Sequence, residues 1–395
     1  MPTYRSFSQH LDPAVTPKRI LALDGGGIRG ILTLGMLREI ESMLRARFGG
    51  DPAFRLSDYF DLIGGTSTGA IIAAGLSLGM TVDEIHGHYM SLGNAVFKRS
   101  LFRKGVFRQK YDAADVSRAL KSVFGDRLMN SHDFRTGLMV MSKRLDTGSP
   151  WPLTNNPGAR YFGLRPNSTT IPNGEFPLWR VVRASTAAPS YFSPEMIEIS
   201  KADPGRELKG VRGEFIDGGL SPSNNPALQL VLTATLAGYK FGWDTGADKL
   251  FVVSLGTGRR LAGAGLTTGL QATSAAHAIT ALATLMDDCS DLVETVMQWL
   301  SSSPTARTID REILDAAPPL TGKPTLGYVR YNVFFDQDWC TKTLGLDRSD
   351  ESLMALAAMD KPENMPDLDA LGQTAGRKLI APAHFPAQFD LGVVH

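Results

Sequence analysis

Glycine-rich turns that each follow a short apolar run most strongly constrain how this chain can fold. Arg19–Leu23 leads into the turn Asp24–Gly30, and Tyr59–Ile63 leads into the turn Gly65–Gly69. Apolar residues then recur at helical spacing, as over Ile31–Phe48. Strands that alternate with helices are typical of an α/β fold with a mainly parallel sheet. Sites in such sheets form at the carboxyl ends of the strands, where these turns lie.

The composition excludes several function classes. The 395 residues are 43% hydrophobic, enough for a large buried core. The net charge of +1 gives no overall field that would attract a nucleic-acid polymer. The two cysteines, Cys289 and Cys340, form no disulfide framework or zinc motif and fit a cytoplasmic location. No apolar run is long enough for a spanning helix, and the polar N-terminal residues lack a signal-peptide pattern.

We expect one α/β domain over residues 18–335. A loose N-terminal arm precedes it over residues 1–17, and a C-terminal extension over residues 336–395 packs on the same domain. Residues 148–177 are rich in Pro, Asn, Gly and Thr, which predicts a long ordered loop. Residues 260–320 are expected to be mostly helical.

The turn Gly65-Thr66-Ser67-Thr68-Gly69 has the form of a nucleophile elbow. A serine between a strand and a helix takes a strained backbone conformation that pushes its hydroxyl outward. The glycines carry no Cβ, so another backbone segment can come close. The following helix points its free N–H groups at the reacting centre. Ser67 is therefore the candidate nucleophile, with an ordinary glycine-rich turn as the alternative.

The run Gly25-Gly26-Gly27-Ile28-Arg29-Gly30 supports two interpretations. It fits the G-x-G-x-x-G fingerprint of dinucleotide-binding proteins. That fingerprint also needs an acidic residue after the second strand, where this chain has glycines and Ser67. Alternatively, the glycines present backbone N–H groups to the oxyanion of ester hydrolysis, where each donor is worth about 3–4 kcal/mol. We favour the oxyanion site, and a nucleotide-binding protein without hydrolysis is the alternative.

A serine hydroxyl needs a base that takes its proton. Among seven histidines, His277 and His384 are the best candidates for a conventional triad. Asp217 is a stronger candidate for the base than these histidines, because Asp217-Gly218-Gly219 follows an apolar run and its glycines permit close approach of another segment. A carboxylate can act as the base if it lies within about 3 Å of the hydroxyl. An Asp-Gly turn without catalytic role is the alternative.

Three motifs in this order resemble the patatin-like phospholipases. They are Asp24–Gly30, Gly65–Gly69 and Asp217–Gly219. The similarity looks continuous from about Arg19 to Gly258 and is weaker beyond. Further stretches that look like the family are Phe97, Tyr111-Asp112, Arg183–Pro189 and Ser254–Gly258.

The resemblance implies a three-layer α/β/α fold and a Ser/Asp dyad that cleaves lipid acyl esters without calcium, another metal or a cofactor. Ser67 would be the nucleophile and Asp217 the proton acceptor, with an acyl-Ser67 intermediate. Residues 18–335 would then form the catalytic domain. A thioesterase or other esterase with the same dyad is the alternative. By motif position, Gly25, Gly26, Gly27 and Arg29 would form or support the oxyanion site, and Gly30, Gly65, Gly69, Gly218 and Gly219 complete the motifs.

Two further segments bear on partners. Residues 97–108 mix basic and apolar side chains, which suits an anionic phospholipid surface and peripheral association with the inner membrane. A solvated loop with buried Phe side chains is the alternative. Residues 151–162 resemble a bacterial branch of the family that appears in antiphage systems and is activated by a cyclic oligonucleotide. The candidate activator-binding residues are Trp151, Asn155, Asn156, Arg160 and Tyr161. Self-association is a further partner hypothesis.

Overall fold

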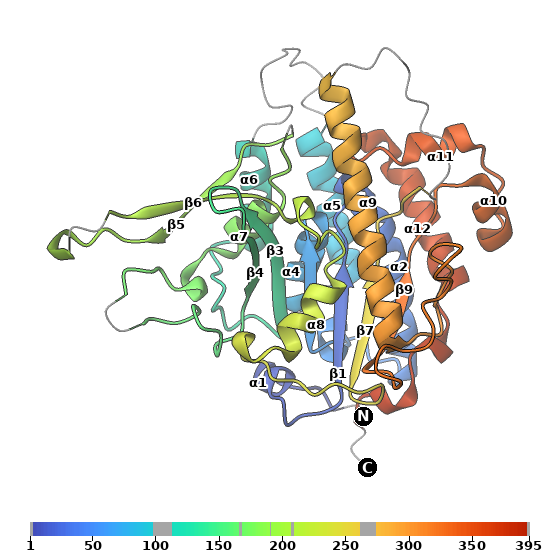
Figure 1. Ribbon diagram of the computed structural model, residues 1–395, viewed down its shortest axis with the longest axis horizontal. Coiled ribbons are helices and arrows are strands. Elements are labelled where there is room, and N and C mark those ends of the chain that lie inside the picture. Colours follow the sequence, from blue (N-terminus) through green and yellow to red (C-terminus); the bar gives the residue numbers. More distant parts are fainter. Residues whose placement is uncertain are drawn as a thin grey trace.

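The computed structural model places a central sheet between two layers of helices (Figure 1). One layer contains α2, α4 and α12, and the other contains α8 and α9. The three-layer α/β/α architecture expected from the sequence is therefore confirmed. The structure describes residues 3–97, 113–165, 168–189, 191–206, 209–260 and 274–392.

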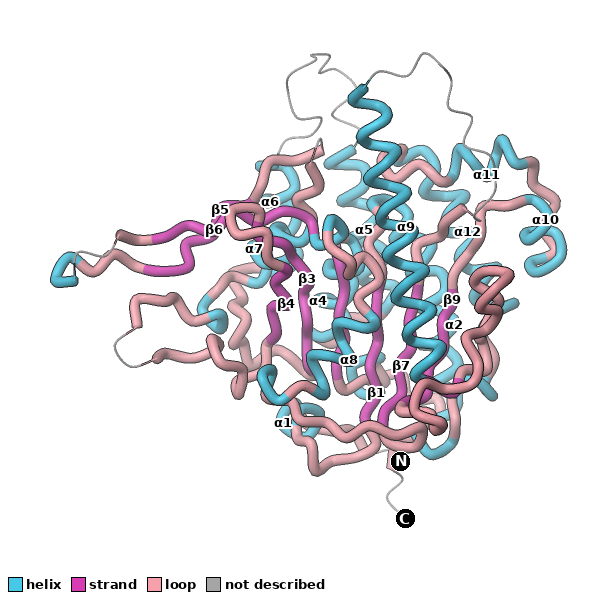
Figure 2. The backbone as a smooth tube through the Cα atoms, viewed as in Figure 1, coloured by secondary structure: helices cyan, strands magenta, loops and turns pink. Residues whose placement is uncertain are grey.

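The sheet runs in the order β5-β6-β3-β2-β1-β7-β9-β8 over the described residues, and β4 pairs with β3 (Figure 2). The central pairs are parallel, as between β1 and β2 or β1 and β7. Only the pairs that involve β4, β5 and β6 are antiparallel among these strands. The strands are β1 (Lys18–Leu23), β2 (Leu62–Thr66), β3 (Gly137–Arg144), β4 (Pro150–Thr154), β5 (Glu195–Ser200), β6 (Val211–Asp217), β7 (Leu250–Leu255), β8 (Ser301–Ser302) and β9 (Leu326–Tyr331).

The helices cover both faces of this sheet, and α9 crosses its front in the view of Figure 1. The helices are α1 (Phe7–Leu11), α2 (Gly30–Arg47), α3 (Leu56–Tyr59), α4 (Thr68–Ser77), α5 (Val82–Phe97), α6 (Ala113–Phe124), α7 (Leu178–Ser185), α8 (Ala227–Thr235), α9 (Ser274–Leu300), α10 (Gln337–Trp339), α11 (Asp350–Leu356) and α12 (Met365–Leu379).

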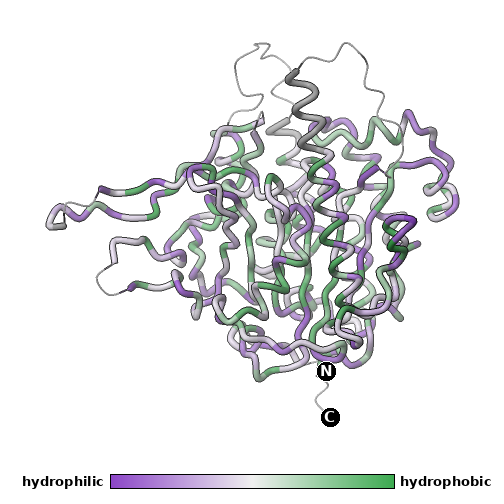
Figure 3. The backbone as a smooth tube through the Cα atoms, viewed as in Figure 1, coloured by the Kyte–Doolittle hydropathy of each residue, from purple (hydrophilic) through white to green (hydrophobic). Residues whose placement is uncertain are grey.

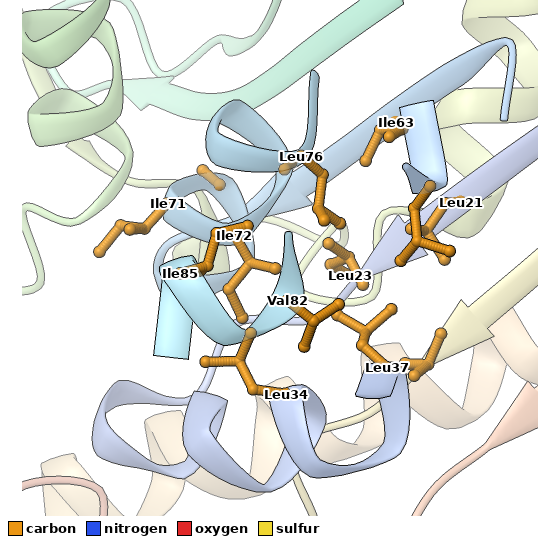
Figure 4. Packing of buried hydrophobic residues seen from close by; sticks show 14 of the residues in the cluster. Leu21, Leu23, Leu34, Leu37, Ile63, Ile71, Ile72, Leu76, Val82 and Ile85 are labelled. Atoms are coloured by element: carbon orange, nitrogen blue, oxygen red, sulfur yellow. The ribbon is translucent and has the colours of Figure 1, made fainter. Parts of the chain in front are cut away.

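The core is divided by the sheet because successive strand residues point to opposite faces. In β1, Leu21 and Leu23 pack with α2 and α4, as Figure 4 shows. Ile20 and Ala22 face the other way, toward α8 and α9. A strand that is covered on both faces has a continuous run of apolar residues in its sequence. Figure 3 shows hydrophobic residues along the central strands.

Three expected elements differ from the structure. Residues 59–61 do not belong to the second strand. The Asp58 carboxylate accepts the N–H of Arg55 and starts the short helix α3, which ends where Phe60 donates its N–H to the carbonyl of Leu56. The predicted loop over residues 148–177 contains the strand β4. Its prolines hide the strand pattern, and they are tolerated because β4 pairs on one side with β3 alone. Of the helical stretch predicted over residues 260–320, residues 261–273 lie outside the described structure, and residues 303–320 are not helical, since prolines follow the end of α9 repeatedly.

The two ends of the described chain pack against the central domain. The N-terminal residues are not loose: Arg5 and His10 both bond to the buried Asp61, at 2.6 and 2.8 Å. At the other end α12 packs closely on α2, where Gly35 and Gly372 face each other. Among the described residues, no helix has the length and apolar character needed to cross a membrane.

Candidate active site

Ser67 lies between β2 and α4 in an unusual backbone conformation. Its φ of 55° and ψ of −120° are strained for a residue with a side chain. The flanking glycines make the turn possible, because a Cβ on Gly65 would lie 2.1 Å from the carbonyl carbon of Gly69. A Cβ on Gly69 would lie 2.2 Å from the carbonyl oxygen of Leu23. The turn therefore has the elbow geometry expected from the sequence.

Asp217 meets Ser67 although the two residues come from strands of opposite direction. β3 extends beyond the end of β2, and β6 returns along it so that Asp217 pairs with Ser142. The Ser67 hydroxyl donates to Oδ2 of Asp217 at 2.6 Å. The N–H of Gly219 donates to Oδ1 of the same carboxylate at 2.7 Å. Both carboxylate oxygens are thus held, and one points at the serine.

Burial raises the pKa of Asp217 to about 6. The Ser67 hydroxyl, the N–H of Gly219 and the charge of Arg183 oppose this rise, but burial outweighs them. The carboxyl remains largely ionised at neutral pH, and it is a stronger base than an exposed aspartate. The arrangement can therefore remove a proton from the Ser67 hydroxyl.

The glycine loop borders the same site as Ser67 and Asp217. Within the described part of the chain, the N–H groups of Gly26 and Gly27 have no protein acceptor, and both residues line the cavity beside Ser67. Gly25 instead donates its N–H to the carbonyl of Asn224 at 3.2 Å. Arg29 donates its N–H back to Gly26 at 3.3 Å. The N–H groups of Gly26 and Gly27 are thus free for a substrate oxygen in the described structure, and the bonds of Gly25 and Arg29 support the loop.

Contacts that the sequence did not reveal hold this loop. Arg330 of β9 donates two hydrogen bonds to the buried Asp24 carboxylate, at 2.8 and 2.5 Å. Burial alone would lower the pKa of Arg330, but the Asp24 carboxylate raises it above its ordinary value. The Thr257 hydroxyl donates to the carbonyl of Gly25 at 2.9 Å. No local pattern marks Arg330 as a partner of the glycine motif, because the contact depends on how β9 lies in the sheet.

The opposite side of the loop is also covered. Ile28 donates its N–H to the carbonyl of Met359 at 2.9 Å, and the Arg29 side chain donates to the carbonyl of Ala357 at 3.2 Å. The Tyr89 hydroxyl donates to the carbonyl of Gly27 at 2.5 Å. Burial lowers the pKa of the Arg29 guanidinium to about 10, which leaves it charged at neutral pH. The loop is therefore fixed from three directions.

A cavity of about 530 Å³ opens beside Ser67 and Asp217. This volume is within the usual range for small-molecule sites. Most of its lining is apolar, with Ser67 and Asp217 at one wall. The lining residues are Gly26, Gly27, Ser67, Thr68, Ile71, Tyr89, Leu92, Gly93, Val116, Thr186, Ala188, Pro189, Tyr191, Phe192, Asp217, Gly219, Leu220, Asn224, Met286, Ala358, Met359 and Asp360.

The histidines considered for a triad are not found beside Ser67 in the described structure. His384 makes a hydrogen bond of 3.0 Å with the Tyr331 hydroxyl and does not line the cavity. His277 lies in the part of α9 whose side chains are outside the described structure. His10 is buried against Asp61, at the opposite ends of the strands. The carboxylate of Asp217 thus occupies the place that a triad histidine would take.

The candidate activator residues separate into two groups. Asn155 is buried, and its side chain accepts the N–H of Leu138 at 2.7 Å. Asn156 is buried as well and donates to a backbone carbonyl at 3.1 Å. The Trp151 ring packs edge-on against Phe215 at 5.1 Å. These three side chains stabilise the chain itself.

Arg160 and Tyr161 form a separate surface group. Tyr161 is 44% exposed, and the guanidinium groups of Arg160 and Arg165 lie 5.5 and 5.3 Å from its ring. The sequence did not single out Arg165. The basic and aromatic segment from residue 98 onward, together with Tyr111-Asp112, lies outside the described residues. The described residues contain no group of three or more His, Cys, Asp or Glu side chains that could hold a metal ion.

Comparison with known proteins identifies the family. The family model described as patatin-like phospholipase matches residues 21–231, more than half of the chain. The chain belongs to the patatin-like phospholipase family. The match contains the elbow, the glycine loop and Asp217, and it ends within α8.

Several curated proteins are similar to the chain over about 53–61% of its length. A cGAMP-activated phospholipase of Vibrio cholerae is 29% identical over 53% of this chain and 55% of its own. A cUMP-AMP-activated phospholipase of Escherichia coli is 35% identical over 55% of this chain and 59% of its own. A probable inactive patatin-like protein 9 of Arabidopsis thaliana is 30% identical over 61% of this chain and 60% of its own. The chain thus spans little more than half the length of these curated relatives.

Proposed function

We propose that this protein is a serine acyl hydrolase that cleaves fatty-acyl esters of membrane phospholipids. The observation that carries the proposal is the 2.6 Å hydrogen bond from Ser67 to the buried carboxylate of Asp217. This pair borders an apolar cavity that suits an acyl chain. Membership of the patatin-like phospholipase family supports the same chemistry.

In the proposed mechanism, Asp217 accepts the proton of Ser67 while Oγ attacks the ester carbonyl carbon. The N–H groups of Gly26 and Gly27 stabilise the negative oxygen of the tetrahedral intermediate. The alcohol leaves with the proton, and an acyl-Ser67 ester remains. Asp217 then takes a proton from water, which attacks this ester, and returns the proton to Ser67 Oγ as the acyl–oxygen bond breaks, so that the fatty acid is released and the serine hydroxyl is restored. None of these steps uses calcium or a cofactor.

The direct test is mass spectrometry of phospholipid vesicles after incubation with the protein. Wild type should release free fatty acid, and Ser67→Ala should release none. Asp217→Asn should lower the rate by about 10²–10⁴-fold, the usual contribution of a general base. Ser122→Ala changes an exposed serine of α6 and is the matched control. Full activity of Ser67→Ala would refute the assignment of the nucleophile.

The alternatives make different predictions in the same assay. A thioesterase would label with a fluorophosphonate at Ser67 and hydrolyse acyl thioesters in preference to phospholipids. A nucleotide-binding protein without hydrolysis would not label. The sequence after the second strand gives little support to this last alternative, because the dinucleotide fingerprint needs an acidic residue there and this chain has glycines and Ser67.

We further propose that a cyclic oligonucleotide activates the hydrolase in antiphage defence. The names of the bacterial relatives, cGAMP-activated and cUMP-AMP-activated phospholipase, support this regulation. Of the five residues considered for the activator site, Arg160 and Tyr161 are the ones whose exposure suits contact with a base or a phosphate. The proposal also places the protein in the cytoplasm, in peripheral contact with the inner membrane, and self-association stays a prediction.

Calorimetry with a panel of cyclic di- and trinucleotides tests the regulation. One of them should bind and should increase fatty-acid release from vesicles. Arg160→Ala and Tyr161→Ala should weaken that binding, whereas Arg118→Ala, an exposed arginine of α6, should not. Absence of binding across the whole panel would contradict the regulation and leave the hydrolase proposal standing.

A further inference from the structure

The C-terminal end of α7 bridges the two residues of the proposed dyad. Ser67 donates its backbone N–H to Oγ of Ser185 at 2.8 Å. Asp217 donates its backbone N–H to the carbonyl of Ala187 at 3.1 Å. Ser185, the last residue of α7, and Ala187, two residues further on, thus contact the backbones of two residues that are 150 positions apart. Both belong to the stretch Arg183–Pro189, for which the mechanism above has no role.

The Ser185 hydroxyl is itself held in one orientation. It donates to the carbonyl of Met141 in β3 at 2.5 Å, and the side chain is fully buried. A hydroxyl has one proton, so donation to Met141 leaves its lone pairs for the N–H of Ser67. β3 lies between β2 and β6, the strands that lead to Ser67 and Asp217. One hydroxyl therefore connects the elbow to the strand that separates the dyad residues.

The conformation of Ser67 explains why an acceptor is needed there. The Ser67 carbonyl accepts the N–H groups of Ala70 and Ile71 at the start of α4, but its own N–H, at the N-cap with a positive φ, has no acceptor within the helix. A buried N–H without an acceptor costs about 1–3 kcal/mol. The side-chain oxygen of Ser185 removes that cost and fixes the direction of the elbow. The N–H of Ser67 is consequently occupied, and oxyanion donors must come from elsewhere.

We propose that Ser185 is a positioning residue for the reaction of Ser67 and Asp217. Its hydroxyl holds the elbow where Ser67 Oγ and the Asp217 carboxylate stay within hydrogen-bond distance. The inference rests on the proposed function. A displacement of about 1 Å at a reacting group can cost about 100-fold in rate, and the loss of this hydroxyl permits such a displacement.

A pair of substitutions isolates the hydroxyl. Ser185→Thr and Ser185→Val add the same crowding to a buried site but differ in the oxygen atom. We expect the Val variant to have a kcat about 100-fold below that of the Thr variant, with KM changed less than about twofold. The rate of fluorophosphonate labelling at Ser67 should fall in parallel. Ser185→Ala, which adds no crowding, should also label slowly and covers the case in which the larger side chains impair folding.

Ser77 is the matched control. It is the last residue of α4, as Ser185 is of α7, and it is fully buried with its hydroxyl 3.4 Å from the carbonyl of Gly137 in β3. It does not contact Ser67. Ser77→Thr and Ser77→Val should therefore have equal labelling rates.

The outcomes separate this proposal from the function on which it rests. Equal labelling rates of Ser185→Thr and Ser185→Val would overturn the role of Ser185 and leave the hydrolase assignment intact. So would a Thr-to-Val ratio of labelling rates at position 77 that equals the ratio at position 185. Wild-type protein that neither labels nor releases fatty acid in the presence of any cyclic oligonucleotide of the panel, or Ser67→Ala that labels like wild type, would overturn the function instead.

Discussion

At the scale of single residues, the raised pKa of the buried Asp217 carboxyl should be visible in the pH dependence of the reaction. If its ionised form is the base, kcat/KM should rise about tenfold per pH unit below pH 6 and level off above it, because the pKa of Asp217 is raised to about 6. An exposed aspartate would give a flat profile down to about pH 4. Rates of acyl-ester hydrolysis measured from about pH 4 to 9 check this. A profile that is flat through pH 5 would contradict the assigned base.

The same burial makes the ionised residue a cost to folding. The folded-state pKa of Asp217 lies above the ordinary value of 3.8, so its contribution to stability is most favourable below about pH 4 and is lost as the pH rises to about 6. Asp217→Asn removes this cost and should raise the free energy of unfolding by up to about 3 kcal/mol near pH 8. The gain should shrink to about half near pH 5.

Urea denaturation at the two pH values measures that gain. The exposed Asp126→Asn is a suitable control and should change stability equally little at both pH values. Asn225→Asp is unsuitable, because the Asn225 side chain caps α8. A destabilised Asp217→Asn at both pH values would show that lost hydrogen bonds outweigh the relief of buried charge.

At the scale of elements, the close packing of α4 against the end of β1 depends on Gly69. A Cβ there would lie 2.2 Å from the carbonyl oxygen of Leu23 and must displace the helix or the strand. Gly69→Ala should therefore lower the free energy of unfolding by about 1–3 kcal/mol and reduce labelling of Ser67. Gly87 in α5 has nothing within 4 Å of an added Cβ, so Gly87→Ala should stabilise the protein slightly. Equal effects of the two substitutions in thermal unfolding would contradict this view.

The ion pair between Arg330 of β9 and Asp24 of the glycine loop leads to a second prediction at this scale. Arg330→Met leaves the Asp24 carboxylate buried without its partner and should cost about 3–5 kcal/mol of stability. Adding Asp24→Asn should recover part of that loss, because no unpaired charge remains. A double-mutant cycle by chemical denaturation measures the coupling. Strict additivity of the two substitutions would show that the pair contributes nothing as a pair.

Local sequence patterns predicted the elements that converge on the site better than the contacts that hold them. The elbow and the glycine loop were recognisable because close backbone approach leaves few choices but glycine at Gly65 and Gly69. No local sequence pattern identifies Ser185 or Arg330 as supports of the site. A buried serine or arginine occurs in many structural settings, and its partner depends on how distant segments pack. The strand β4 was missed because two prolines mask its alternation.

At the scale of the whole molecule, the C-terminal part of the chain is joined to the site through helix packing. α12 approaches α2 closely enough that a Cβ on Gly372 would lie 2.3 Å from the carbonyl oxygen of Leu32. The segment before α12 contains Met359, which accepts the N–H of Ile28 in the glycine loop. Movement of α12 should therefore reach the loop.

Gly372→Val tests this connection. It should lower both the free energy of unfolding and kcat, because α12 and the segment at Met359 must shift together. Gly392→Val is a control at a glycine with nothing within 4 Å of an added Cβ, and it should leave both unchanged. Thermal unfolding and fatty-acid release measure the two effects. Lost stability with unchanged kcat would show that α12 supports the fold without affecting the site.

The supports of the glycine loop lie largely outside the region that family similarity outlines. A fragment cut to residues 21–231 would keep Ser67 and Asp217 but would lose Thr257, Arg330 and Met359, all of which contact the loop. Chimeras that exchange residues 21–231 with the matching region of a relative would separate the reacting groups from the residues that support the loop. The smallest working unit must therefore be chosen from three-dimensional contacts, and it extends at least through the approach to α12.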